Sequence, residues 1–505
     1  MPKQIRQPVT WLMTCEPDSG EVIGWWDGRQ GEKVPAVIEG PAGTFIACGL
    51  TSAHLPDAAQ LLRALVGRWA PDIWEQSIPT SPAHLGPYGP YLTLAQLAED
   101  VQKKSADGQD VVTALSDIAE AFSLLDTAAG LKSQGRFEES LAAARRADSL
   151  ASDALWKSFA PVDGEMRGVW MHNYAKPSWE VAAKKLADAN FNAVFPYICS
   201  AGCAFYDSDV LPHDKSVAEE GDFLQKASEA CRRYDLPLHP RVLNLATLWA
   251  TAETKKALAN AGRLVVTNTG STGTWLCPSH PANRRLQVDV VREIVTGYDV
   301  TGVQFDYLRY PWKNVCFCDR CRAEFEQMIG RRVQKWPESA YSGDLRDEYL
   351  DFRRHQINTL VAELYQTVKD IDPQLEVSAA VFINWESHRD TFGQDWKTWV
   401  DNGWVDFVCP MDYTDDLETL RGYVRRQNVW VDNQVPMFTG IGVNTDKCRN
   451  NAPYEVLRQI EVAREEGADG WVIFNYCPLF EEKILPRMSP GLTRKPTRYR
   501  PAAGE

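Results

Sequence analysis

The sequence predicts an α/β protein whose largest part is a (β/α)8 TIM barrel at residues 165–490. From Met166 onward, short runs of β-branched and aromatic residues alternate with amphipathic helical stretches. Eight such pairs fit into about 320 residues, which suits this fold, and their strict alternation is typical of parallel strands. A helical hairpin at residues 91–160 and a small α/β piece at residues 1–80 are expected to precede the barrel.

The first 80 residues contain two β-rich runs around Pro-Ala-Gly, followed by a helical stretch at residues 57–75. This order resembles the closing part of an amidotransferase-like domain. The Gly-x-Cys-x-Gly nucleophile turn of such domains is missing, because Cys48 stands in "IACGL". We therefore predict an accessory or truncated domain, with a glutaminase as the alternative.

Two amphipathic stretches follow, at residues 92–131 and 137–159. Leucine and alanine recur in them at helical spacing with charged residues between, as in a packed pair of helices. We expect a spacer or brace.

The barrel prediction depends on eight strand-like runs and the helical stretches between them. The strands are expected at residues 167–173, 192–198, 236–244, 301–308, 375–382, 405–413, 435–443 and 467–476. Helical stretches are expected at residues 178–190, 222–234, 283–298, 354–371 and 452–467. Residues 262–277 would form an extra strand or loop after the third strand.

Composition limits the classes of partner. The formal net charge of −14 and the isoelectric point near 5.2 argue against a nucleic-acid backbone or an anionic membrane surface, and are compatible with a neutral ligand. No apolar run approaches the length of a membrane span, and the first residues lack the apolar core of a signal peptide. The 18 tryptophans favour a carbohydrate site, since their flat rings stack on sugars.

The active site of a TIM barrel lies at the carboxyl-terminal ends of its strands, so the last residues of each run are the candidates. In "GVQFDYLRYP", period-two alternation directs Asp306 into the barrel, and a second carboxylate, Asp412, ends the sixth strand. Two such carboxylates suit glycoside hydrolysis, which needs an acid and a nucleophile or base. The alternative is a structural Asp306 paired with Arg241 or Arg309.

The runs "RGVWMHN", "GVQFDYLRYP", "VDFVCPMDYT" and "GWVIFNY" resemble the glycosyl hydrolase-like family 10 over about 320 residues in the right order. The resemblance implies a TIM barrel acting on a polysaccharide, with Asp306 as the leading catalytic residue and peptidoglycan strands among the substrates of relatives. Relatives often have a doubled acidic pair at Asp306-Tyr307 and glutamine at Asp412. Glu386 therefore competes for the second role, and a substrate-assisted mechanism stays open.

Aromatic and polar residues near the strand ends are expected to bind the sugar chain. The aromatic candidates are Trp170, Tyr197, Trp249, Tyr307, Trp312, Trp385, Tyr413 and Tyr476. The polar candidates are His172, Arg241, Asn244, Arg309 and Asn475.

A cysteine cluster follows the fourth strand in "VCFCDRCRAEF". Cys316, Cys318 and Cys321 are close enough in sequence to share one tetrahedral ion, with Cys277 or His280 as the fourth ligand. The two interpretations are a structural zinc site and a set of reduced thiols. No cofactor is expected for catalysis.

Together these features predict a glycoside hydrolase acting on a polysaccharide, with bacterial cell-wall glycan as a candidate. The alternative is a catalytically silent glycan-binding barrel. Nucleic acid and a membrane span are not expected. Because such substrates usually lie outside the cytoplasm, we expect a role in the cell envelope or outside the cell. The cytoplasm is the alternative, since no signal peptide is visible.

Overall fold

The described chain divides into two compact units. The computed structural model describes residues 20–27, 33–41, 43–46, 62, 65, 66, 70, 72–172, 178–443, 445, 448 and 452–499. The first unit extends to Leu155, and the second begins at Trp156 and includes Gly108–Val111.

The first unit contains a three-stranded antiparallel sheet in the order β1-β2-β3. Its strands are β1 (Glu21–Asp27), β2 (Lys33–Gly40) and β3 (Gly43–Ile46). The last two correspond to the predicted β-rich runs around Pro-Ala-Gly. A short helix, α2 (Asp72–Ser77), covers the end of the predicted helical stretch. Cys48 and most of residues 57–71 lie outside the described residues.

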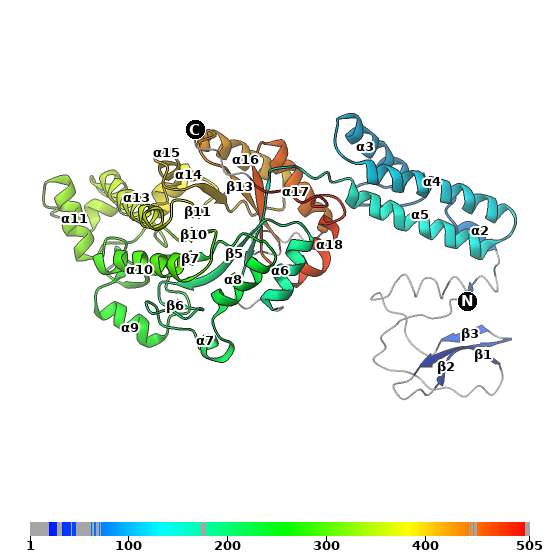
Figure 1. Ribbon diagram of the computed structural model, residues 1–505, viewed down its shortest axis with the longest axis horizontal. Coiled ribbons are helices and arrows are strands. Elements are labelled where there is room, and N and C mark those ends of the chain that lie inside the picture. Colours follow the sequence, from blue (N-terminus) through cyan, green and yellow to red (C-terminus); the bar gives the residue numbers. More distant parts are fainter. Residues whose placement is uncertain are drawn as a thin grey trace. The chain divides into compact units, whose positions relative to one another are not determined.

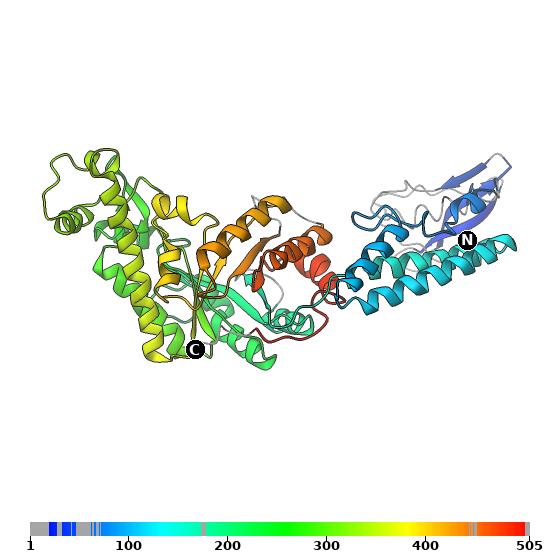
Figure 2. The ribbon, with the colours of Figure 1, turned by 90° about the horizontal axis from the view of Figure 1, so that it is seen from above.

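Three helices, not two, follow in the first unit: α3 (Leu94–Ala106), α4 (Val112–Ser133) and α5 (Phe137–Lys157). The predicted first helix is divided because Asp107 caps α3 and Gly108 takes a positive φ of 81°, which ends a helix at little steric cost to glycine. Helices α4 and α5 lie side by side in Figures 1 and 2. The hydroxyl of Ser140 on α5 donates to the carbonyl of Ala128 on α4 at 2.6 Å.

Eight parallel strands form the barrel of the second unit, which confirms the predicted fold. The strands are β4 (Met166–Met171), β5 (Ala193–Ser200), β7 (Arg241–Leu243), β10 (Gly302–Asp306), β11 (Glu376–Val381), β12 (Phe407–Pro410), β13 (Phe438–Gly442) and β14 (Gly470–Phe474). Except for β12, each pairs with the next in sequence, and β14 pairs with β4. A parallel bridge between Val408 and Met437 brings β12 to β13 and closes the circle.

Helices surround these strands, as Figures 1 and 2 show. The helices that follow successive strands are α6 (Trp179–Asp188), α8 (Phe223–Arg233), α10 (Pro281–Gly297), α13 (Arg346–Ile371), α15 (Trp396–Asp401), α16 (Leu417–Val431), α17 (Pro453–Glu465), and after β14 the π-helix η2 (Phe480–Ile484) with α18 (Leu485–Met488). Among the described residues, every helix is too short or too polar to cross a lipid bilayer.

Insertions enlarge the loops that leave the carboxyl-terminal ends of several strands. They contain β6 (Cys203–Ala204), α7 (Lys215–Glu220), α9 (Ala252–Asn260), β8 (Leu264–Val266), β9 (Thr272–Leu276), α11 (Asp319–Ile329), α12 (Glu338–Tyr341) and α14 (Trp385–Phe392). The predicted extra strand is thus an antiparallel hairpin of β8 and β9.

Strand residues alternate between two apolar layers because the barrel strands are buried on both faces. One cluster fills the barrel interior and includes Trp170, Phe407 and Phe438. A larger cluster packs the outer strand faces against the helices. Gly440 makes room for the Trp170 indole, since a Cβ there would stand 3.0 Å from the ring. The interior is therefore a packed core, as in other TIM barrels.

Candidate active site at the carboxyl-terminal end of the barrel

Strand β10 directs Asp306 into the barrel, as its alternation predicts. Val303 and Phe305 belong to the outer apolar layer. Gln304 lies inside, where it accepts a hydrogen bond from the Trp170 indole at 2.6 Å. Asp306, two residues further, is on the same inner face and 3% exposed.

Two groups hold the Asp306 carboxylate. The guanidinium of Arg241 lies 3.3 Å from Oδ2, and the backbone N–H of Tyr307 donates to Oδ1 at 2.7 Å. Burial raises the pKa of Asp306 above its ordinary value, while the charges of Arg241 and Arg309 and the Tyr307 N–H act in the opposite direction. At a given pH, a larger fraction of Asp306 is therefore protonated than of an exposed aspartate, which suits a proton donor.

Arg309 lies among four aromatic rings beside this carboxylate. Its guanidinium carbon is 4.8 Å from the Trp275 ring, 4.7 Å from those of Tyr307 and Phe382, and 5.4 Å from that of Phe392. Cation–π attraction stabilises a charge in such a setting. Three of the rings come from other loops, so the sequence pattern around Asp306 did not reveal them.

A second aromatic group surrounds Phe474, a residue that the sequence analysis missed. The His172 ring lies 5.6 Å from Phe474, the Tyr413 ring 4.9 Å, and the Arg241 guanidinium 6.0 Å. Burial and the charge of Arg241 lower the pKa of His172 to about 4, so this imidazole is neutral near pH 7. Val472 faces the barrel interior, and Phe474 lies two residues further along the same strand. Period-two alternation would therefore have identified Phe474 as inward-facing.

Tyr197 of β5 and Trp249 of the loop after β7 form a close, tilted pair of rings. Their ring centroids lie 4.7 Å apart with an interplanar angle of 33°. Tyr197 is buried, whereas Trp249 is 44% exposed. An exposed indole supported from behind by a second ring is suited to stacking on a sugar face.

The prediction that Asp412 shares the inner face with Asp306 is wrong. Phe407, Cys409 and Met411 face the interior, so Asp412 points outward by alternation. Its Oδ1 accepts a 2.6 Å hydrogen bond from Gln427 on the outer helix α16. No hydrogen bond to Oδ2 is present among the described residues.

We expect Asp412→Asn to change how stability depends on pH. Burial raises the pKa of Asp412 to about 7 in the folded protein, against about 3.9 in an unfolded chain. Between about pH 4 and 7 the folded state holds a proton that the unfolded state has lost, so the free energy of unfolding falls as pH rises. Asparagine does not ionise. The variant should therefore be more stable than wild type at about pH 8, by on the order of a few kcal/mol.

Urea unfolding followed by tryptophan fluorescence, at about pH 5 and pH 8, measures this difference. Asp235→Asn is the matched control, because the Asp235 side chain is 90% exposed. An unchanged pH dependence in Asp412→Asn would show that this carboxyl is not protonated in the folded protein.

The structure places Glu386 on the first turn of α14, where its side chain is exposed. Its neighbour Trp385 packs against Trp430 at 5.8 Å and donates to the Asp395 carboxylate at 2.5 Å. Trp312 is 54% exposed and lies against Phe392. Of the two tryptophans, Trp312 presents the more open ring surface.

Three residues that were predicted to contact the sugar have side chains buried in packed layers. Trp170 fills the barrel interior below Tyr413 and Phe474. The Asn244 amide bonds to Gln287 on α10 at 3.0 Å. Tyr476, 2% exposed, belongs to the outer layer. Asn475 is half-buried at the end of β14.

Comparison with known proteins identifies the family of this barrel. The profile of the glycosyl hydrolase-like 10 family matches residues 165–455, more than half of the chain. The chain belongs to the glycosyl hydrolase-like 10 family.

Curated relatives of this glycosyl hydrolase-like 10 chain are distant. The S-layer-related protein of Niallia circulans is 24% identical over 203 residues, covering 33% of this chain and 13% of that protein. Glycosyl hydrolase YngK of Bacillus subtilis is 25% identical over 212 residues, covering 37% of this chain and 39% of that protein. The matches thus span well under half the length of either relative.

A solved structure supports the fold of the glycosyl hydrolase-like 10 barrel. The PgaB (BpsB) glycoside hydrolase domain from Bordetella bronchiseptica superposes with a TM-score of 0.52 at 14% identity. The superposition covers 65% of this chain and 98% of that domain. The family supports a role in cleaving or binding glycans, and this neighbour supports the fold.

The four predicted metal-binding cysteines of the glycosyl hydrolase-like 10 chain meet in space. The sulfur atoms of Cys277, Cys316, Cys318 and Cys321 lie within 4.8 Å of one another. His280, the other candidate for the fourth position, instead caps α10, where its ring accepts from the Ala282 N–H.

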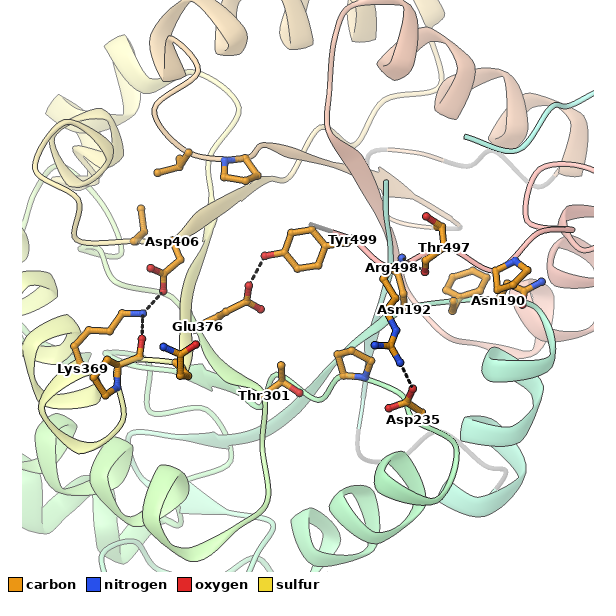
Figure 3. Close-up of a pocket in the computed structure, with 18 of the residues that line it drawn as sticks. Asn190, Asn192, Asp235, Thr301, Lys369, Glu376, Asp406, Thr497, Arg498 and Tyr499 are labelled. Carbon is orange, nitrogen blue, oxygen red and sulfur yellow. Dashed lines mark hydrogen bonds and ion pairs between the residues drawn. The ribbon is translucent and has the colours of Figure 1, made fainter. Parts of the chain in front are cut away.

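A cavity of about 1170 Å³ lies at the opposite, amino-terminal end of the glycosyl hydrolase-like 10 barrel. Figure 3 shows Tyr499 pointing into it toward Glu376, with which it forms a hydrogen bond. Lys369 and Asp406 form an ion pair of 2.8 Å in its wall. None of the predicted site residues lines this cavity, and this end of a TIM barrel serves stability.

Proposed function

We propose that the protein is a glycoside hydrolase in which Asp306 protonates the oxygen of the glycosidic bond as that bond breaks. The observation that carries the proposal is a buried carboxyl on the inner face of β10, at the end of the barrel where TIM-barrel enzymes react. Burial favours the neutral acid, which is the form that donates a proton. After transfer, Arg241 and the Tyr307 N–H stabilise the carboxylate.

The outward position of Asp412 and the exposed position of Glu386 support a substrate-assisted mechanism. Of the three predicted carboxylates, only Asp306 lies on the inner face of the barrel. Where no second carboxylate attacks the anomeric carbon, the carbonyl oxygen of a 2-acetamido group on the sugar can do so, and water then opens the intermediate. We therefore propose N-acetylated hexosamine glycans, such as the strands of the bacterial cell wall, as substrates, and the cell envelope as the place of action.

Mass spectrometry of reaction products tests the proposal. Purified full-length protein is incubated with intact peptidoglycan, peptide-free glycan strands, the same strands after de-N-acetylation, and a neutral glucan. We expect shorter oligosaccharides from the acetylated strands and none from the deacetylated strands. Equal cleavage of both would refute substrate assistance, and products from the glucan alone would refute the substrate class.

Trp249→Ala is expected to raise the dissociation constant for the glycan about 10-fold, equal to ~1.4 kcal/mol, because the exposed stacking surface is lost. Isothermal titration calorimetry in an Asp306→Asn background measures binding without turnover. Trp25→Ala removes an exposed tryptophan of the three-stranded sheet and serves as the control. Unchanged binding in the Trp249 variant would exclude this ring from the sugar site.

A glycan-binding barrel without activity is the second candidate. The ion pair between Arg241 and Asp306 favours it, because a nearby arginine stabilises the ionised carboxylate, which has no proton to donate. Calorimetry that finds tight binding of acetylated strands, with no product from any glycan, would establish this function instead.

A further inference from the structure

The cysteine cluster of Cys277, Cys316, Cys318 and Cys321 has the geometry of a metal site. The Cys277 sulfur lies 3.5 Å from that of Cys321 and 3.8 Å from that of Cys318. Four thiolates bound to one tetrahedral zinc at about 2.3 Å would have their sulfurs about 3.8 Å apart. A disulfide would need about 2.05 Å, so these contacts are too long for a covalent pair.

We propose that these four cysteines bind one structural zinc ion. Tetrahedral coordination by four sulfurs is typical of zinc, with a single iron as the competing occupant. All four positions would be filled by protein thiolates, which leaves none open for water or substrate. The ion therefore serves the fold and takes no part in glycan cleavage.

Backbone N–H groups around the cluster point at cysteine sulfur atoms, as donors to thiolates would. The N–H of Val266 points at the Cys316 sulfur at 3.3 Å, and the N–H of Cys321 at the Cys318 sulfur at 3.5 Å. Such donors are the usual outer partners of metal-bound ligands. Cys318 also caps the eleven-residue helix α11, whose amino-terminal end favours negative charge.

A buried arginine near the cysteine cluster is the second observation, because its positive charge is more stable with a negative charge nearby. Arg353 is 1% exposed and makes its hydrogen bonds to the main-chain carbonyls of Asp390, Trp312 and Thr391. Among the described residues, no carboxylate forms an ion pair with it. Its guanidinium carbon lies 4.4 Å from the Tyr310 ring. Its charge interacts with Tyr310 and Tyr349 first, and then with Cys316 and Cys321. A zinc bound by four thiolates carries a net charge of about −2 and would balance this guanidinium.

The proposed ion joins segments that are far apart in sequence. Cys277 directly follows β9, whereas the other three cysteines lie in the loop after β10 and at the start of α11. Strand β9 also carries Trp275, whose ring contacts Tyr307 at 5.2 Å and Arg309 at 4.8 Å. Zinc would therefore hold one wall of the region around Asp306. This last consequence rests on the proposed function, but the metal assignment does not.

Metal analysis of the full-length protein, purified without chelator, tests the proposal. Inductively coupled plasma mass spectrometry is expected to find about one zinc per chain, and Cys318→Ser/Cys321→Ser should lose it. Cys231→Ala, which removes a buried thiol from α8, should keep it. A wild-type protein with no metal, with iron in place of zinc, or with disulfides among the four cysteines would overturn the proposal.

A second measurement covers the case in which the double variant does not fold. Titration of wild type with a mercurial thiol reagent should release one zinc, detected by a colorimetric chelator, as four thiols react. Apoprotein should bind one Co²⁺ with the intense absorption of tetrahedral thiolate coordination. Absence of both signals would refute the site. Neither measurement uses a glycan, so failure here is separate from failure of the proposed hydrolase.

Discussion

Replacing Asp306 with asparagine is expected to lower the rate of glycan cleavage by about 100- to 10,000-fold, the usual contribution of a general acid. Asparagine has nearly the same shape and can still accept the Tyr307 N–H bond. It has no proton to give to the leaving oxygen. The loss should therefore appear in kcat, while the affinity for the glycan stays within about threefold.

Two controls separate this chemistry from a loss of structure. Asp299→Asn changes an exposed carboxylate just before the start of β10 and should leave the rate unchanged. Asp306→Glu restores an acid but displaces it by one methylene, so it should recover only part of the activity. If Asp306→Asn keeps full activity with an unchanged melting temperature, Asp306 is structural and the proposed mechanism fails.

Replacing Glu165 with alanine is expected to lower the free energy of unfolding by about 3–5 kcal/mol, the range for breaking a buried ion pair. Glu165 is 4% exposed just before β4, and its carboxylate accepts from Arg167 at 2.9 Å and from Arg464 at 2.6 Å. Arg167 is fully buried. Removing the carboxylate leaves two arginines without their partner.

Urea unfolding at constant pH measures this loss, with the midpoint and slope compared between variants. Asp235→Asn is again the control, since its ion pair with Arg498 is 3.1 Å long but about nine-tenths exposed on both sides. Such a surface pair is worth about 0–1 kcal/mol. Equal effects of the two substitutions would show that the Glu165 network contributes little to stability.

Much of the barrel could be predicted because each strand is a short apolar run between helical stretches. The eight runs are visible in the sequence, and their order around the barrel follows their order in the chain. The division of the first helical stretch at Gly108 was missed, although "ADGQD" contains a turn signal. The amphipathic pattern continues on both sides of this turn, so the two helices were interpreted as one.

The candidate site was only partly predictable. Asp306 was identified correctly as inward-facing because Gln304 shares its face and both interrupt an apolar strand. Asp412 was misplaced since its strand is apolar on both faces, so alternation alone does not say which face is inside. The rings of Trp275, Phe382 and Phe392 reach Arg309 from loops whose paths only the folded chain defines.

The amino-acid sequence by itself determined the barrel, the family and the strand that carries Asp306, because these depend on local periodicity and short motifs. Only the tertiary structure decided which carboxylates face the interior, which aromatic rings stay exposed, and that Cys277 joins Cys316, Cys318 and Cys321. Those features depend on contacts between residues distant in sequence. Such contacts form through packing of the whole barrel, which no local pattern encodes.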